Sequence, residues 1–184
     1  MGDIQPPKGL RRSDPATRGC GRRYLNCMHP NAENVAATLR ANEVTGTVVE
    51  LPEPAPTAAS AAAQLGCEVG AIANSLVFNA DGAPLLVLTS GAHRVDTGKV
   101  AALLRADSVK RADPDFVRAH TGQPIGGVAP VGHPRRVRTL VDVWLGEYEV
   151  VWAAAGHPST VFPTSFAELR RITGGSAADV GADG

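Results

Sequence analysis

Residues 121–134 are the stretch of this chain best suited to holding a ligand, because they combine a stiff path with close backbone approach. Their sequence, TGQPIGGVAPVGHP, contains four glycines and three prolines with apolar residues between them. Glycine permits a positive φ angle and close approach of a ligand, whereas proline fixes φ and removes a donor. Backbone N–H groups at Gly126 and Gly127 are therefore candidate donors to a carbonyl oxygen or an oxyanion. A tight connection between two strands, with no ligand, is the alternative interpretation.

Several other kinds of site are not supported. The glycines are followed by no Gly-Lys-Ser/Thr and lack G-x-G-x-x-G spacing, so this is not a usual phosphate loop. Cys20, Cys27 and Cys67 are odd in number and show no metal-ligand spacing. No Ser-His-Asp set is evident. Any role of residues 121–134 must therefore come from backbone donors and shape.

The elements that must position this stretch alternate irregularly between helix and strand. Capping residues and apolar periodicity predict helices at 31–42, 57–65, 96–105, 113–120 and 164–173, with Asn31, Asp96, Asp113 and Thr164 or Ser165 as caps. Alternating or β-branched runs predict strands at 45–51, 69–78, 85–89, 109–112, 137–140, 149–155 and 161–162. Because strict β-α alternation is absent, we expect a single α+β domain with a mixed, largely antiparallel sheet.

Formal charge is unevenly distributed along the chain. Residues 1–30 contain six Lys or Arg against two Asp, a net of +4, so residues 31–184 carry −4 in a chain that is neutral overall. A body with this balance is not a basic nucleic-acid-binding surface, so any RNA contact must be local, and no DNA partner is expected. Aromatic residues make up only 4% of the chain, which argues against base-stacking platforms.

The N-terminal segment differs in composition from the rest. Residues 1–30 are rich in Arg, Gly and Pro with little hydrophobic periodicity, so we interpret them as disordered. Met28 precedes the first periodic segment, which suggests that the domain begins there and that a translated leader precedes it; a basic arm that folds on RNA is the alternative. No apolar run matches a membrane span or a signal peptide, and the odd cysteine count fits a reducing cytoplasm. Residues 181–184 are predicted to be a tail.

Three segments, at 70–78, 126–132 and 155–169, together carry a family resemblance. They contain GAIANSLVF, GGVAPVG, and AGHP followed by a strand and a capped helix. In this order and spacing they resemble the YbaK/EbsC family, also called the aminoacyl-tRNA synthetase-associated or prolyl-tRNA editing domain. Each motif is weak alone, but together they are fairly specific for the fold. The resemblance covers about residues 31–180 and implies a curved mixed sheet packed with helices.

This resemblance also implies an activity. Family members hydrolyse a wrongly attached amino acid, cysteine or alanine, from proline tRNA, either freestanding or within prolyl-tRNA synthetase. The chain is too short to hold a synthetase, so it resembles the freestanding kind, a deacylase acting in trans. The implied partners are the acceptor end of a mischarged tRNA and prolyl-tRNA synthetase. No metal and no organic cofactor is expected. A non-catalytic module that binds the tRNA end or the aminoacyl group is the competing class.

The family's G-x-x-x-P motif maps onto Gly126 and Pro130. By this resemblance, N–H groups near Gly126 and Gly127 bind the ester carbonyl or its oxyanion, and the neighbouring Val128, Ala129 and Pro130 contact the substrate. The terminal ribose hydroxyl of the tRNA is thought to assist in the family, which would explain why no catalytic triad is evident.

The sequence departs from the family pattern at Asn74. Family members usually carry a lysine just before a Thr/Ser/Asn-Leu pair, and here Asn74 precedes Ser75-Leu76. Asparagine donates a hydrogen bond but supplies no positive charge to a phosphate. Either Asn74 and Ser75 carry an altered form of the same chemistry, or catalysis is weakened and binding remains. The structural alternative for Asn74 is a strand residue that satisfies a turn.

Two histidines complete the candidate site. His157, between two predicted strands, is a candidate contact to the ester, its amino group or a water, and a turn histidine is the equally open alternative. His93 and Arg94 follow a hairpin strand and are candidates for holding the tRNA end, against the alternative of an exposed loop pair.

Overall fold

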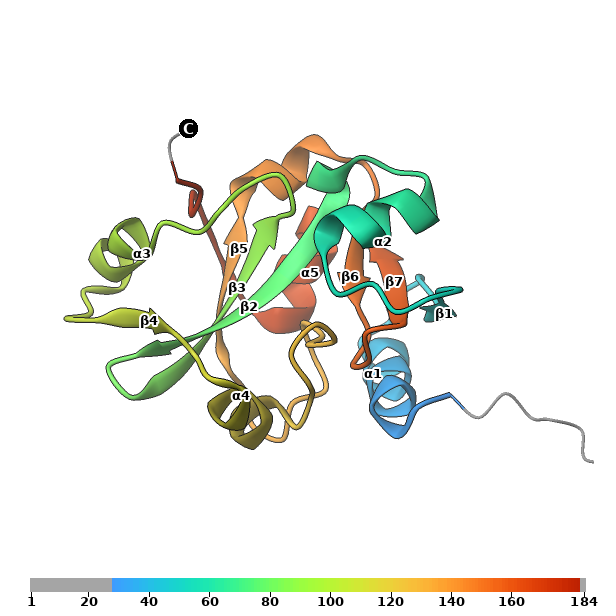
Figure 1. Ribbon diagram of the computed structural model, residues 1–184, viewed down its shortest axis with the longest axis horizontal. Coiled ribbons are helices and arrows are strands. Elements are labelled where there is room, and N and C mark those ends of the chain that lie inside the picture. The colour runs from blue at the N-terminus through green and yellow to red at the C-terminus, as the bar shows by residue number, and fades with distance from the viewer. Residues whose placement is uncertain (1–27, 183–184) are drawn as a thin grey trace, which may run out of the picture.

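A mixed sheet runs through the centre of the domain and carries helices on both faces (Figure 1). The computed structural model describes residues 28–182, so the predictions for residues 1–27 and 183–184 lie outside it. Seven strands follow the order β1-β7-β6-β2-β3-β5-β8, and β4 pairs with β2. Four of the seven ladders are antiparallel and three are parallel. The predicted fold class, an α+β domain with a mixed sheet, is confirmed.

Every predicted helix and strand is present, with differences in length. The helices are α1 (Pro30–Ala41), α2 (Ala58–Leu65), α3 (Thr97–Leu104), α4 (Pro114–Thr121) and α5 (Phe166–Thr173), with 3-10 turns η1 (Val69–Ala71) and η2 (Val143–Glu147). The strands are β1 (Val49–Glu50), β2 (Ile72–Ala80), β3 (Ala83–Ser90), β4 (Val109–Arg111), β5 (Arg138–Asp142), β6 (Val151–Ala154), β7 (Thr160–Thr164) and β8 (Ser176–Ala178).

Two faces of the sheet hold separate parts of the core. Residues 121–134 are called the glycine-rich loop below. Apolar residues from this loop and from α1, α4 and α5 pack with Ala73 and Val77 of β2 on one face. On the other face, α3 packs with Phe78, and α2 packs with Ile72. Because successive strand residues point to opposite faces, β2 is the strand on which both halves of the core meet.

The first helix begins differently from the prediction. His29, not Asn31, is its cap: the His29 Nδ1 atom accepts the Asn31 N–H at 3.2 Å, and Pro30 occupies the first turn. Proline suits that position because its missing N–H is not needed there. Asn31 instead donates its side-chain amide to the Gly122 carbonyl at 3.4 Å. Residues 28–30, assigned from composition to the disordered segment, therefore contribute to the domain.

Other boundaries differ because distant contacts decide them. The predicted strand at 45–51 is reduced to β1, which pairs only with Val161 and Thr160 of β7. The predicted strand at 69–78 begins as η1, where Gly70 lies so close to the Tyr148 hydroxyl that a Cβ would collide with it. Strand β8 was not predicted, since its three residues show no apolar alternation.

The end of the described chain is tied to the loop that follows β3. Gly181 forms an antiparallel bridge with Val95, and the Ala182 N–H donates to the Arg94 carbonyl at 2.8 Å. The Asp96 N–H donates to the Val180 carbonyl at 2.9 Å. Residues 181 and 182, placed in a tail from the sequence, thus help to fix the loop that carries His93 and Arg94.

Candidate active site

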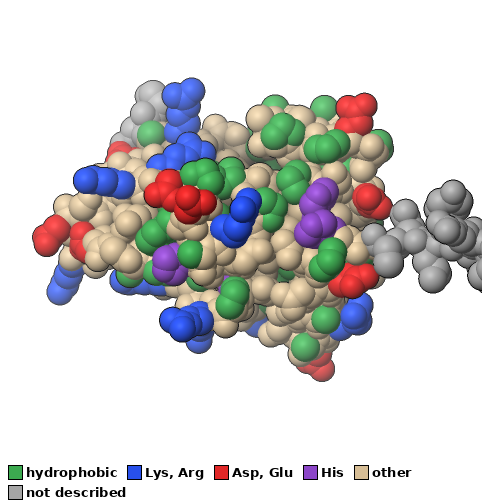
Figure 2. Space-filling model, turned by 60° about the horizontal axis from the view of Figure 1, so that its bottom comes forward, with side chains coloured by type: hydrophobic (Ala, Val, Ile, Leu, Met, Phe, Trp, Pro, Cys, Tyr) green, Lys and Arg blue, Asp and Glu red, His purple; other side chains and the backbone are tan. Residues whose placement is uncertain are grey.

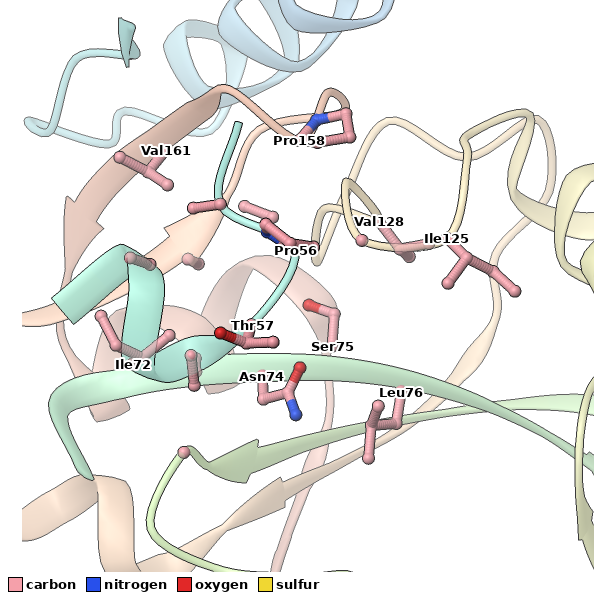
Figure 3. Close-up of a pocket in the computed structure, with 18 of the residues that line it drawn as sticks. Pro56, Thr57, Ile72, Asn74, Ser75, Leu76, Ile125, Val128, Pro158 and Val161 are labelled. Carbon is pink, nitrogen blue, oxygen red and sulfur yellow. The ribbon is translucent and has the colours of Figure 1, made fainter. Parts of the chain in front are cut away.

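A cavity of about 570 Å³ lies where one edge of β2 is left without a partner strand (Figure 3). On this edge β6 pairs with Ile72 and Ala73, and β4 pairs with residues 78–80. Between the two ladders, residues 74–77 pair with no strand on that side within the described part of the chain. The cavity walls come from this gap, the start of α2, the glycine-rich loop and the turn between β6 and β7.

The main chain of Ser75 points into this gap. The Gly91 N–H donates to the Ile72 carbonyl on the β3 side at 2.8 Å, and the Ala112 N–H donates to the Val77 carbonyl on the opposite side at 3.2 Å. Polar main-chain groups alternate in direction along a strand, so residue 75 faces the same way as residue 77. The backbone N–H and carbonyl of Ser75 therefore face the cavity.

The side chain of Ser75 faces the glycine-rich loop. It lies between Ala73 and Val77, which pack with Val128 on that face of the sheet. Its Oγ atom is buried and makes no hydrogen bond to any residue that the structure describes. A buried hydroxyl without a partner is unusual, and in a cavity it is available to a ligand.

Asn74 points to the opposite side of β2 from Ser75 (Figure 3). Both residues line the cavity, which therefore extends around the free edge of the strand. The Asn74 side chain is half-buried, and none of the described residues hydrogen bonds to its amide. The strand does face the glycine-rich loop as expected, but it presents Ser75 and not Asn74 to that loop.

Within the glycine-rich loop, Gly126 is the glycine that faces the cavity. Its φ is +85°, and the nearest atom to an added Cβ would be the Pro56 Cα at 4.0 Å. Ile125 and Val128 line the cavity beside it. The Gly126 N–H has no hydrogen-bond partner among residues 28–182, which leaves it free for a ligand.

Gly127 has a different role from the one expected. Its N–H already donates to the Pro124 carbonyl at 3.0 Å, so it is not a free donor. An added Cβ would lie 2.7 Å from the His157 carbonyl carbon and 2.8 Å from the Pro158 nitrogen. The residue therefore lets two backbone segments pack together and does not open space for a ligand. Neither it nor the buried Ala129 and Pro130 is among the residues that line the cavity.

A buried glutamine that the sequence analysis did not single out holds the loop in shape. Gln123 is 2% exposed; its Oε1 atom accepts the Ala129 N–H at 2.7 Å, and its Nε2 donates to the Val131 carbonyl at 3.3 Å. A single glutamine in a loop shows no periodicity. The one signal in the sequence that could have identified it is its position as a polar residue among apolar neighbours.

His157 lies behind Gly127 and outside the cavity wall. Its Nδ1 atom accepts the Ser159 N–H at 3.2 Å, and its ring stacks on His29 with 4.6 Å between ring centroids. These contacts are those of a turn histidine. The following Pro158 lines the cavity, so His157 affects the site through the path of its own backbone.

His93 and Arg94, which were predicted to act together, lie in different surroundings. The exposed Arg94 lines the cavity, whereas the His93 ring meets Trp144 edge-on at 4.9 Å between centroids. The His93 Nδ1 is 3.4 Å from an oxygen of Asp142, close enough for an ion pair but without hydrogen-bond geometry. Asp142 is fully buried and accepts the Ser90 N–H at 3.0 Å. His93 and Asp142 thus support the loop that presents Arg94.

The basic residues after the glycine-rich loop lie in a separate groove of about 440 Å³, which includes His133, Arg135 and Arg136 but not Arg138. Burial lowers the pKa of His133, whose Nε2 atom is 2.8 Å from the Ala129 carbonyl oxygen. Elsewhere, Lys and Arg side chains are dispersed among acidic and apolar ones over the face drawn in Figure 2. This pattern agrees with a body that is not a broad nucleic-acid-binding surface.

The described residues also lack two other kinds of feature. No group of three or more His, Cys, Asp or Glu side chains there is arranged to hold a metal ion. None of the helices in the same range has the length and apolarity needed to cross a membrane.

Known proteins share this fold and this sequence pattern. The family model for the aminoacyl-tRNA editing domain matches residues 52–172. The chain belongs to this family. The match spans α2, the free edge of β2, the glycine-rich loop and most of α5, so it includes every wall of the cavity. The predicted resemblance to the YbaK-type editing domain is confirmed.

Individual relatives place the domain near proline–tRNA ligases. The chain is 37% identical over 159 residues to a proline–tRNA ligase of Nitratidesulfovibrio vulgaris strain DP4, covering 75% of this chain but 28% of that protein. It thus spans about a quarter of the length of that ligase. A solved structure of a candidate trans-editing enzyme for prolyl tRNA synthetase is 39% identical with a TM-score of 0.80, covering 85% of this chain and 99% of that one. The domain is therefore an editing domain related to prolyl-tRNA synthetase.

Proposed function

We propose that this protein is a trans-acting aminoacyl-tRNA deacylase that hydrolyses the ester of a mischarged tRNA, of the Cys- or Ala-tRNA(Pro) class. The observation that carries the proposal is the cavity at the free edge of β2, where unused main-chain and side-chain donors of an editing-domain fold converge. The likeness to a freestanding editing structure along nearly its whole length supports action in trans.

In the proposed reaction, water attacks the ester carbonyl, the new C–O bond forms, and the bond to the ribose oxygen breaks. The ribose oxygen leaves with a proton, giving free amino acid and uncharged tRNA. We assign the Gly126 N–H and the Ser75 N–H as the donors that stabilise the oxyanion. One such donor contributes roughly 3 kcal/mol in known hydrolases. Gly127 and His157, predicted from sequence to act directly, hold Gly126 and Pro158 in position instead.

The described residues supply no candidate general base to the cavity. Among residues 28–182, no Asp, Glu or His side chain lines it. An aminoacyl ester is activated, so oxyanion stabilisation and a correctly held water supply much of what hydrolysis needs. A hydroxyl of the terminal ribose is the group we assign to assist proton transfer, as the family resemblance implies. Catalysis would then depend on an intact ribose at the 3′ end of the substrate.

Several alanines line the cavity beside larger apolar residues. Ala55, Ala58 and Ala61 line the cavity from the α2 side, and Ala73 and Ala153 line it from the sheet. Such a wall separates alanine from cysteine weakly, because one methylene-sized group changes binding by only about 1–3 kcal/mol. The expected substrates, which rest on the family resemblance, are tRNAs carrying small, wrongly attached amino acids, in the cytoplasm and with prolyl-tRNA synthetase nearby.

A deacylation panel tests this function. Purified protein is incubated with Ala-, Cys-, Ser- and Pro-tRNA(Pro), and release of each amino acid is followed against the uncatalysed rate. Faster loss of alanine or cysteine, with Pro-tRNA(Pro) spared, is the expected result. Binding of the tRNAs without turnover of any of them would instead support the non-catalytic module, for which the absence of a lysine at Asn74 is the favouring observation.

A further inference from the structure

We propose that Arg94 and Arg111 form a binding site for a phosphodiester of the substrate, on the Asn74 side of the cavity. This inference rests on the proposed function and names the part of the RNA that the site holds. Both side chains line the cavity, and both are exposed. No hydrogen bond or ion pair to any described residue engages either guanidinium.

The two arginines approach from opposite flanks of β2. Arg111 is on β4 and lies in register with Phe78 of β2, so its side chain shares the sheet face of Asn74 and Leu76. Arg94 follows β3, which pairs with the other edge of β2. Asn74 and the two arginines all line the cavity.

The backbone around Arg94 is held by residues 181 and 182. Its carbonyl accepts the Ala182 N–H at 2.8 Å, and the next residue, Val95, bridges to Gly181. An arginine on a loop fixed in this way loses less conformational freedom on binding than one on an unsupported loop. The contact gives the C-terminal residues a part in positioning the substrate.

Charge balance identifies the ligand chemistry. Among the described residues, two arginines and no Asp or Glu line the cavity, so the charge of its described lining is positive. An aminoacyl ester has no free carboxylate, because that group is esterified. Its anionic groups are the phosphodiesters that precede the terminal nucleoside. The planar fork of a guanidinium matches phosphate oxygens in geometry as well as charge.

The experiment compares two substrates that share the ester. One is alanyl-adenosine, which has no phosphodiester, and the other is an alanylated minihelix with the acceptor stem of tRNA(Pro). The measured quantity is the ratio of kcat/KM for the minihelix to kcat/KM for alanyl-adenosine. Arg94→Ala and Arg111→Ala should each lower this ratio about ten- to one-hundredfold, the range for losing a hydrogen bond to a charged group.

A matched control is adjacent in the sequence. Lys110 is exposed on β4, is absent from the cavity lining and projects from the other sheet face. Lys110→Ala removes the same charge and should leave the ratio as in the unchanged protein. Arg111→Lys keeps the charge but not the fork and should recover part of the ratio. Arg94→Ala and Arg111→Ala should each also reduce the salt dependence of minihelix binding, measured as the slope of log K against log salt concentration, by about 1.

Two failures are distinguishable. If the unchanged protein hydrolyses both esters and the ratio is the same in Arg94→Ala, Arg111→Ala and Lys110→Ala, the phosphodiester site is wrong and the deacylase proposal stands. If the unchanged protein hydrolyses neither ester, the deacylase proposal fails. The phosphodiester site is then tested by binding of a fluorescently labelled minihelix that carries no amino acid, measured by fluorescence anisotropy. Equal affinity and salt slope in all three variants would then overturn it; a selective loss in the two arginine variants would support it.

Discussion

Gly127 packs directly on the backbone of His157. A Cβ added to Gly127 would lie 2.7 Å from the His157 carbonyl carbon and 2.8 Å from its Cα. Real Cβ contacts are not this short, and the obstructing atoms are backbone, which cannot rotate away. The loop that lines the cavity and the turn that carries Pro158 are therefore locked together through this glycine.

Gly127→Ala should destabilise the protein. Forcing the two segments apart costs about 1–3 kcal/mol, as for other overpacked sites, and each kcal/mol lowers the Tm of a domain this size by about 2–4 °C. Gly146→Ala is the control, since a Cβ there would meet only Phe166, at an ordinary 3.6 Å. Thermal unfolding of both variants measures the difference. A Gly127→Ala protein as stable as the control would show that the packing is looser than the structure indicates.

The sequence predicted the glycine-rich loop but not the directions in which its glycines face. The glycine-rich composition predicted a loop with close backbone approach, and the loop has it. Composition alone could not show that Gly126 faces the cavity while Gly127 faces His157, because the partner lies 30 residues away in sequence. The gap at residues 74–77 was likewise hidden, since it arises where two distant ladders, with β6 and β4, each end.

The alternation of side chains along β2 was easier to predict from the sequence. Asn74 and Ser75 are adjacent in a predicted strand, so their opposite directions followed from strand geometry. Which face meets the glycine-rich loop required the packing of Ala73 and Val77. The His29 cap was missed because histidine is not among the preferred capping residues, whereas Asp96, Asp113 and Ser165 are and were found.

The N-terminal boundary gives a second prediction. A protein beginning at Met28 should unfold at the same temperature as the full chain, because residues 1–27 differ sharply in composition from the domain. A protein beginning at Asn31 lacks the His29 cap and the ring stack with His157. Loss of a cap costs about 1 kcal/mol, so its Tm should be about 2–4 °C lower. A large Tm loss already in the first truncation would show that residues 1–27 dock on the domain.

His133 gives a prediction about pH. Burial lowers the pKa of this residue below its usual value. As pH falls below about 6.5, the unfolded chain binds a proton at this histidine before the folded one does. The unfolded state is then favoured, so stability contributed by neutral His133 is present above this pH and is lost as pH falls, by up to about 1.4 kcal/mol per pH unit for a one-proton difference.

The comparison is between the unchanged protein and His133→Gln, which removes the titration at this position. Urea midpoints at pH 7.5 and 5.5 should differ less in the variant. The remaining histidines contribute equally to both proteins and cancel in the comparison. Identical pH dependence in the two would show that His133 titrates alike in the folded and unfolded states.

Ser75 should show opposite effects on stability and on rate. Its buried Oγ has no partner, so Ser75→Ala should leave stability unchanged or raise it, by about 1 kcal/mol at most. If Oγ contacts the substrate, the same change should lower kcat/KM for deacylation. Ser90→Ala is the control: Ser90 Oγ donates to the Gly70 carbonyl at 2.9 Å, and its loss should lower stability by about 0.5–1.5 kcal/mol. A Ser75→Ala protein with full activity would place Oγ outside the reaction.

Asn74 is tested by two changes on the other side of the same strand. If its amide donates to the substrate, Asn74→Ala should lower the rate by about one to three powers of ten. The loss should appear in kcat more than in KM if the bond strengthens in the transition state. The Asn74 side chain is half-buried and has no hydrogen-bonded partner among residues 28–182, so the fold should tolerate the change.

Asn74→Lys separates altered chemistry from lost chemistry. Lysine here would place a third positive charge on the face that holds Arg94 and Arg111. If the natural protein is a binding module that lacks a needed charge, the change should raise deacylation from near the uncatalysed rate. If the two arginines already supply that charge, lysine should tighten minihelix binding without raising kcat. Deacylation and binding unaffected by both alanine and lysine would show that the Asn74 side of the cavity does not contact the substrate, and the reacting ester would then have to lie wholly between Ser75 and Gly126.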